Sequence, residues 1–412
     1  MAEALEQSGW DLPDSTPPES GDAMEEQSAG FDEGYSVQYQ PGWLPAAPAP
    51  DAEISLSLDS PAAGLPVPDG APAPSPQSAD SANSFAFPGG GSTSPAFEPP
   101  SNPDDWNGGT GNWTTASDWS DGVPTSSSDV AISVKNSDVT LNIGTTVNSI
   151  TIGIGSATLD IENASGTDTV STSFSNSGKL YVDWTSSGGG SDLVVDGTFT
   201  NSGTVDAGYG SGASAGTTIS LGGLVNNKGA TFELYGSTNH ASTLTFTGGD
   251  SSFTANAGTF ELYYVNPVTL NTAFTNSGTF ETYYTDVTIG GNFTNSGTLN
   301  IENGSTVTVD GTFTNSGTLE IDADGGSSGS SLTIQSTLTN TGSIYFGNSS
   351  LNTAETFTLA GLTNGTNGSG ATFDVTGSQS HEATLDFTGG ASAFTDNAGT
   401  FELYNVTPLT LN

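Results

Sequence analysis

The amino-acid sequence predicts an all-β fold, a right-handed parallel β-helix preceded by a disordered N-terminal arm. Two observations predict this fold. A short motif recurs at intervals of 19 to 32 residues, and apolar and polar residues alternate on both sides of it. Intervals of this length are typical of stacked supersecondary units, and alternation with a period of two is typical of strands.

The recurring motif is an aromatic residue or leucine followed by Thr-Asn-Ser-Gly or a close variant. Its copies begin at Phe174, Phe199, Leu224, Phe253, Phe274, Phe293, Phe313, Leu338, Leu362 and Phe394. A longer repeat overlies the short one, because Ala230–Asn271 aligns with Ala371–Asn412 at an offset of 141 residues. The second long copy stops where the first runs on into another coil, so we expect the chain to be a fragment of a longer protein.

Each coil is expected to hold two or three short strands that pair with the same strands of the next coil, about 4.8 Å away. A stack of this kind leaves no lateral strand edge. The asparagine of the motif has two interpretations. It is either a local turn residue that tolerates left-handed backbone, or one rung of a side-chain ladder along the stack. The ladder would comprise Asn176, Asn201, Asn226, Asn276, Asn295, Asn315 and Asn340.

Composition divides the chain into three segments. Residues 1–103 are predicted to be disordered, because 17 of the 21 prolines precede Ser101 and the segment is acidic and poor in β-branched residues. Residues 104–142 hold Trp106, Trp113 and Trp119 among turn-forming residues. They are predicted to cap the first coil, the alternative being a sugar-stacking site. Residues 143–412 are predicted to form the β-helix.

Charge limits the possible partners. The chain has 45 acidic and 3 basic residues and a formal net charge of -42. Such a chain cannot neutralise nucleic-acid phosphates, and anionic lipid surfaces should repel it. We therefore expect no nucleic-acid partner. No stretch approaches the ~20 apolar residues of a membrane-spanning helix, so we also expect no transmembrane segment. A monomeric stalk that contacts carbohydrate, or a host or abiotic surface, fits these limits.

The pattern at 106–132, with Trp106-Asn-Gly-Gly, Asn112-Trp113 and Asp118-Trp119-Ser-Asp-Gly-Val-Pro124, precedes the Phe-Thr-Asn-Ser-Gly-Thr coils. Together they resemble bacterial autotransporter-like and filamentous-haemagglutinin-like adhesins over roughly residues 104–412. The resemblance implies a β-helical stalk exported to the outer membrane surface or secreted, with a role in adhesion or biofilm formation. It implies an extracellular or bacterial cell-surface location.

Two columns of outward side chains are predicted on the strand after each turn. Glu233, Glu261, Glu281 and Glu320 would form an acidic column, and Tyr235, Tyr263, Tyr283 and Tyr404 would lie two residues further on. Like charges on neighbouring strands repel, so the carboxylates either face water or are bridged by calcium, which prefers oxygen ligands. The tyrosines either form a platform for sugar rings or stack between coils for stability alone.

These observations predict an adhesin-like structural stalk that binds glycans or surfaces, with no catalytic residues and no cofactor unless the acidic column binds calcium. One alternative is a carbohydrate-active β-helix enzyme, either a polysaccharide hydrolase or a lyase. The lyases of this fold class use an Arg or Lys base, and this chain has no arginine and three scattered lysines. The other alternative is a spacer without a ligand.

Overall fold

The structure is a computed structural model that describes residues 103–409, except for 164–165, 185–188, 209–213, 325–328, 367–369 and 391–392. The N-terminal arm predicted over residues 1–103 lies outside the described residues, apart from its last residue. The described part holds no α-helix and two 3-10 helices, η1 (Ala116–Asp118) and η2 (Gly249–Ser251). The predicted all-β class is therefore confirmed.

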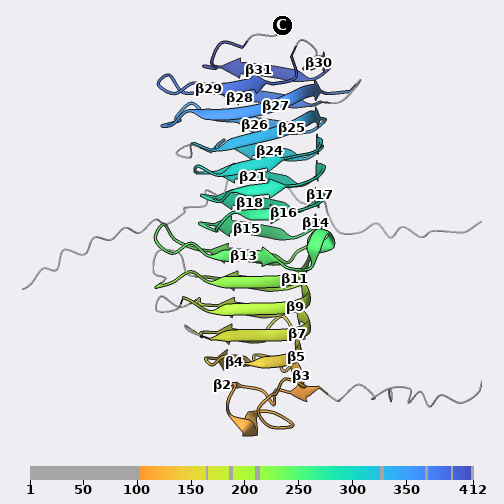
Figure 1. Ribbon diagram of the computed structural model, residues 1–412, viewed down its shortest axis with the longest axis vertical. Coiled ribbons are helices and arrows are strands. Elements are labelled where there is room, and N and C mark those ends of the chain that lie inside the picture. The colour runs from red at the N-terminus through yellow and green to blue at the C-terminus, as the bar shows by residue number, and fades with distance from the viewer. Residues whose placement is uncertain are drawn as a thin grey trace, which may run out of the picture. The chain divides into compact units, whose positions relative to one another are not determined.

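The described strands form two parallel sheets that run along the whole stack of coils (Figure 1). Sheet 1 has 13 strands. They are β2 (Thr110–Asn112), β4 (Asp138–Leu141), β6 (Thr158–Ile161), β8 (Lys179–Val182), β10 (Thr204–Ala207), β12 (Thr231–Tyr235), β15 (Thr259–Tyr263), β18 (Thr279–Tyr283), β21 (Thr298–Glu302), β24 (Thr318–Ile321), β26 (Ser343–Phe346), β28 (Thr372–Thr376) and β31 (Thr400–Tyr404).

Sheet 2 has 18 strands. They are β1 (Asp104–Asp105), β3 (Asp129–Ile132), β5 (Thr146–Ile152), β7 (Thr167–Asn176), β9 (Asp192–Asn201), β11 (Thr218–Asn226), β13 (Thr243–Phe246), β14 (Ala255–Asn256), β16 (Val268–Leu270), β17 (Phe274–Asn276), β19 (Val287–Ile289), β20 (Phe293–Asn295), β22 (Thr306–Val309), β23 (Phe313–Asn315), β25 (Ser331–Asn340), β27 (Glu355–Asn364), β29 (Ala383–Phe387) and β30 (Phe394–Asn397).

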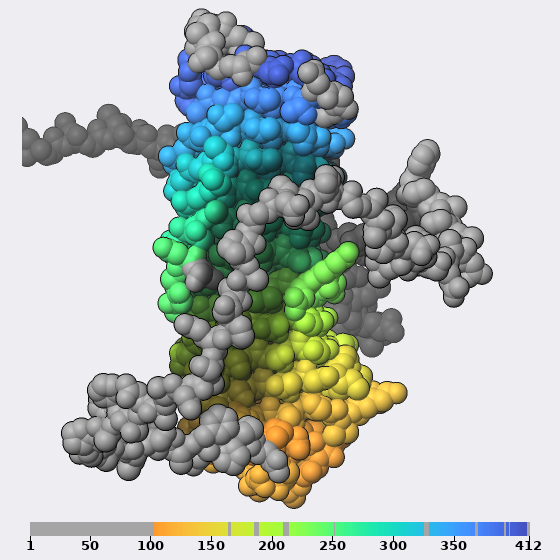
Figure 2. All heavy atoms as spheres, turned by 90° about the vertical axis from the view of Figure 1, so that its right-hand side faces the viewer, coloured from red at the N-terminus to blue at the C-terminus, as the bar shows by residue number. Residues whose placement is uncertain are grey.

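Each coil gives one strand to sheet 1 and one long or two short strands to sheet 2, then returns through the asparagine–glycine turn. Equivalent residues of successive coils pair in register, as Phe260 of β15 does with Phe280 of β18, and Phe274 of β17 with Phe293 of β20. In the space-filling view the coils follow one another in chain order from orange to blue (Figure 2). The predicted parallel β-helix is confirmed.

Parallel pairing begins earlier than the segment predicted to form the β-helix. β1 pairs with β3 and β2 pairs with β4, so residues 104–142 already contribute strands to both sheets. Trp106, Trp113 and Trp119 are at most 3% exposed and pack edge to face, with ring centroids 4.8–4.9 Å apart. Their rings are thus buried against the first coils, where no sugar could stack on them.

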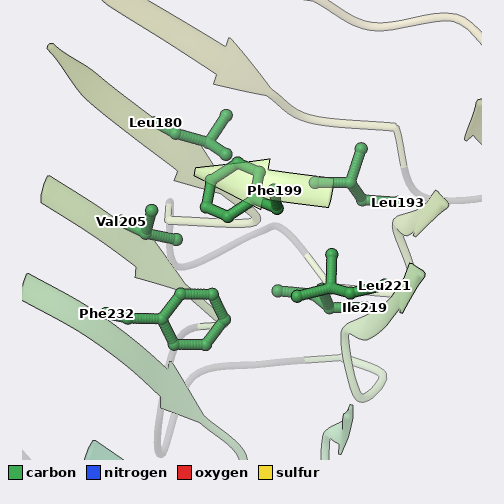
Figure 3. A pocket seen from close by; sticks show the side chains of 7 residues that line it. All are labelled: Leu180, Leu193, Phe199, Val205, Ile219, Leu221 and Phe232. Atoms are coloured by element: carbon green, nitrogen blue, oxygen red, sulfur yellow. The ribbon is translucent and has the colours of Figure 1, made fainter. Parts of the chain in front are cut away.

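The core is a narrow apolar column between the two sheets. Figure 3 shows one section of it, where Leu180, Val205 and Phe232 of sheet 1 point toward side chains of sheet 2. The facing side chains belong to β9 and β11, and they include Phe199 and Leu221. Alternation along each strand sends every second side chain inward, which is why the sequence alternates between apolar and polar residues.

An unbroken ladder of asparagine side chains lines the turn between sheet 2 and sheet 1. Each Nδ2 donates to Oδ1 of the asparagine in the next coil at 2.9–3.0 Å. The members are Asn176, Asn201, Asn226, Asn256, Asn276, Asn295, Asn315, Asn340, Asn364 and Asn397. None of them has a positive φ. The ladder interpretation is therefore confirmed, and left-handed backbone is not the reason for asparagine here.

The glycine of the motif is required by close stacking of the backbone. A Cβ on Gly297 would lie 2.0 Å from the carbonyl oxygen of Gly278, and a Cβ on Gly317 would lie 2.0 Å from that of Gly297. No other residue type fits such a contact. The turn thus brings successive coils near enough for the asparagine side chains to reach one another.

Candidate functional site

The outward face of sheet 1 carries the predicted acidic column. Register places Asp206, Glu233, Glu261 and Glu281 in four consecutive coils. Glu320 is separated from them, because Asn300 occupies the intervening coil. Three of the four glutamates predicted to bind calcium therefore lie together. Glu320 instead lines a groove farther along the stack with Tyr345 and Asp374.

The acidic column holds carboxylates that resist ionisation. Burial raises the pKa of Glu261 to about 7, and the charges of Glu281, Glu233 and Asp206 add to the rise. Burial likewise raises the pKa of Asp206 to about 6, with Glu233 as the second cause. Near neutral pH the column therefore takes up protons or attracts cations, as its like charges require.

Three of the four predicted tyrosines form a continuous stack beside the acidic column. The rings of Tyr235 and Tyr263 lie 4.7 Å apart and those of Tyr263 and Tyr283 lie 4.4 Å apart, with interplanar angles of 21° and 9°. Trp184, which sequence reasoning overlooked, contacts Tyr235 edge to face at 6.2 Å. Tyr404 stands apart, since Thr376 takes the equivalent place in the preceding coil.

The tyrosine hydroxyls bind the neighbouring carboxylates. The hydroxyl of Tyr235 donates to Glu233 at 2.9 Å, and that of Tyr263 donates to Glu281 at 3.3 Å. Burial and these charges hold the pKa of both tyrosines far above the ordinary range. The two columns thus form one hydrogen-bonded surface in which ring faces contact each other and ring edges face outward.

A second pair of tyrosines lies at the corner that follows sheet 1. Tyr264 and Tyr284 directly follow β15 and β18, and their rings stack at 4.4 Å with an interplanar angle of 11°. Both have left-handed backbone, with φ of 51° and 46°. Bulky side chains rarely adopt this conformation. In the next coil the corresponding residue is Asn303, which tolerates it readily.

These two tyrosines border an open groove of about 390 Å³. Its other walls include Ser237, Asn266 and Asp286, which offer hydroxyl, amide and carboxylate groups. Tyr284 is 50% exposed. Its ring lies against Gly304 of the next coil, which has no side chain to cover it. The groove thus combines an exposed aromatic ring with polar groups, the combination that orients small polar ligands.

Sequence reasoning named Tyr263 and Tyr283 but not their neighbours Tyr264 and Tyr284. The sequence does contain a feature that could have identified them: a Tyr-Tyr pair occurs in two successive coils and nowhere else in the chain. In the second long repeat Asn405 takes the place of Tyr264. The groove is therefore particular to this part of the stack.

Within the described ranges, no group of three or more His, Cys, Asp or Glu side chains is arranged to hold a metal ion. Calcium on the acidic column thus stays a prediction. In the same ranges no helix has the length and apolar character needed to cross a membrane. Comparison of the chain with protein-family models, with curated proteins and with solved structures gives no match.

Proposed function

We propose that the chain is the β-helical stalk of a secreted or cell-surface adhesin, and that it binds neutral glycans in the groove bordered by Tyr264 and Tyr284. The observation that carries this proposal is the left-handed backbone of two stacked tyrosines in adjacent coils, the half-buried Tyr264 and the exposed Tyr284. Strained residues of this kind persist where function requires them. If the residue only had to form the corner, asparagine or glycine would suffice, as Asn303 shows in the next coil.

Neutral glycans suit the groove for three reasons. The net charge of -42 repels anionic ligands. An exposed tyrosine ring offers an apolar face for the C–H groups of a sugar, and Asn266 and Asp286 offer partners for its hydroxyls. A long stack of coils with the binding groove on its side suits a stalk that contacts extended surfaces.

Glycan arrays followed by titration calorimetry test the proposal. A neutral oligosaccharide is expected to bind wild-type protein. Tyr284→Asn, which keeps a residue suited to left-handed backbone, is expected to weaken binding about tenfold, or about 1.4 kcal/mol. Tyr404→Asn, which changes an exposed tyrosine far along the stack, is the matched control and should bind like wild type. No binding to any neutral glycan would favour a spacer without a ligand.

A second candidate is a carbohydrate-active enzyme, favoured by one observation. Glu261 has a pKa of about 7 and lies between Glu233 and Glu281, which resembles the pairing of an acid with a second carboxylate in glycoside hydrolysis. Incubation with neutral and acidic polysaccharides and measurement of new reducing ends tests this candidate. Release of ends by wild-type protein but not by Glu261→Gln would establish a hydrolase and displace the adhesin proposal.

A further inference from the structure

Three carboxylates are buried at one corner of the stack, in three consecutive coils. Glu302 ends β21, Asp322 follows β24, and Glu355 begins β27 in the coil after that. Their side chains are 3%, 0% and 1% exposed. Removing an ionised carboxylate from water is costly unless a positive group or hydrogen-bond donors meet it.

Asp322 is fixed in place by backbone donors. The N–H of Asn303 donates to Oδ1 at 2.8 Å and the N–H of Ser330 donates to Oδ2 at 2.7 Å. Left-handed backbone at Asp322, with φ of 45°, turns this side chain into the interior. Two backbone hydrogen bonds thus hold the carboxylate in place.

Glu355 lacks such support. Neither of its carboxylate oxygens makes a hydrogen bond of good geometry among the described residues, although Asp322 and the backbone N–H of Gly329 lie close enough to affect its pKa. Its side chain passes beside Gly347, where a Cβ would lie 3.0 Å from Oε2, and it faces Asp322. Burial raises the pKa of Glu355 to about 10, with the charge of Asp322 as the second cause and that of Glu302 also contributing.

An earlier corner of the stack has the same arrangement with one chemical difference. Register aligns Asp183 with the position of Asp322, Gly208 with that of Gly347, and Thr217 with that of Glu355. There the hydroxyl of Thr217 donates to Asp183 at 2.7 Å, and the N–H of Ser191 donates to it at 2.9 Å. At the earlier corner a hydroxyl donor faces a carboxylate, whereas at the later corner two carboxyl groups face each other.

We propose that Asp322 and Glu355 bind a divalent cation of the calcium class inside the stack, with the negative charge of Glu302 adding to the attraction. Two facing carboxylates require a positive centre between them. One proton neutralises only one of the three carboxylates Glu302, Asp322 and Glu355, whereas a divalent cation neutralises two. Carboxylate oxygens are the ligands that calcium prefers, and both oxygens of Glu355 are available to it. The site is independent of glycan binding.

The test compares metal-free protein with protein titrated with calcium, using calorimetry and thermal unfolding at neutral pH. Wild-type protein is expected to bind calcium, and its melting temperature is expected to rise on binding. Glu355→Thr reproduces the arrangement around Thr217, so it is expected to fold, to lose one equivalent of bound calcium and to be stable without it. Thr217→Glu is the converse variant and is expected to gain one equivalent.

The acidic column on the outer face of sheet 1 is a second possible source of calcium binding, and a variant separates the two. Glu233→Gln, Glu261→Gln and Glu281→Gln combined should leave the buried equivalent intact. If Glu355→Thr binds as much calcium as wild type, the buried site is refuted. If wild-type protein binds no calcium and loses stability as pH rises through about 10, the two carboxylates share a proton, which also overturns the proposal.

Discussion

The side-chain amide of Asn276 donates to Oδ1 of Asn295 at 2.9 Å and also to the backbone carbonyl of Thr298 at 2.7 Å. Both asparagines are fully buried. Each amide therefore links its own coil to the next through one side-chain acceptor and one backbone acceptor. Such fully satisfied polar chains fix the register of the stack, because any slip would leave every buried amide without a partner.

Asn295→Ala is expected to destabilise the protein by about 2–4 kcal/mol. The substitution leaves Nδ2 of Asn276 and Oδ1 of Asn315 without their ladder partners, and each orphaned buried group costs about 1–3 kcal/mol. Chemical denaturation measures the change. Thr294→Ala, on the same strand but exposed, should stay within about 0.5 kcal/mol of wild type. Equal effects for the two variants would contradict a structural role for the ladder.

Stability is expected to fall as pH rises through neutrality. The pKa of Glu261 increases from 4.5 to about 7 on folding. Its favourable contribution is therefore complete below about pH 4.5 and disappears as pH rises through about 7. Asp160 and Asp206, raised to about 6, act in the same direction. For Glu261 alone we expect a loss of about 2 kcal/mol, measured by urea denaturation at a series of pH values.

Glu261→Gln tests the assignment, because glutamine does not titrate. Its stability curve against pH should be flatter than that of wild type across the neutral range. Glu382→Gln removes a carboxylate from an exposed position and should keep the wild-type slope. A Glu261→Gln curve as steep as the wild-type curve would place the titrating group elsewhere.

Tyr283 and Tyr284 are neighbours in the chain with opposite expected effects. Tyr283→Asn removes the stacking on Tyr263 and should cost about 0.5–1.5 kcal/mol. Tyr284→Asn also loses one stacked neighbour, but it relieves left-handed strain of about 1–3 kcal/mol. The second variant should therefore be at least as stable as wild type by thermal unfolding. A large loss at Tyr284 would mean that its backbone is unstrained.

Calcium on the outer acidic column is expected to raise the melting temperature by bridging Glu233, Glu261 and Glu281. The reason is that a bound cation removes the repulsion between carboxylates on adjacent strands. In the presence of chelator, the triple Glu→Gln variant of these positions should have a higher melting temperature than wild type. Millimolar calcium should raise its melting temperature by less than it raises that of wild type. A calcium response that survives intact in this variant would exclude the outer column.

Most of the architecture follows from local pattern. The Thr-Asn-Ser-Gly turn and the two-residue alternation predict the coils, and the register between them follows because each coil repeats the last. The ladder was predicted only in part. Asn256, Asn364 and Asn397 were missed. The copies of the motif at Phe253 and Phe394 carry one extra residue before the asparagine, which a register shift absorbs in the second case. The copy at Leu362 lacks the serine between Asn364 and Gly365.

The site was less predictable for a physical reason. The sequence indicates which strand residues face outward, but it does not show how the chain leaves a strand. Tyr264, Tyr284 and Asp322 lie just beyond strand ends, where left-handed backbone sets the direction of the side chain. Glu355 was missed because its importance depends on Asp322, which belongs to the preceding coil and lies more than thirty residues away in the chain.

Most strands of sheet 1 have four or five residues, and the side chain at the corner differs from coil to coil. After the four-residue strands β8 and β24, an aspartate turns inward and is fully buried. The five-residue strands β15 and β18 end with a tyrosine on the outer surface. The five-residue strand β21 ends on the buried Glu302, so strand length and residue type together set whether the corner carries an interior polar group or an exterior ring. Coil duplication followed by changes in strand length or residue type gives this scaffold a simple route to new surfaces, which protein designers could use as well.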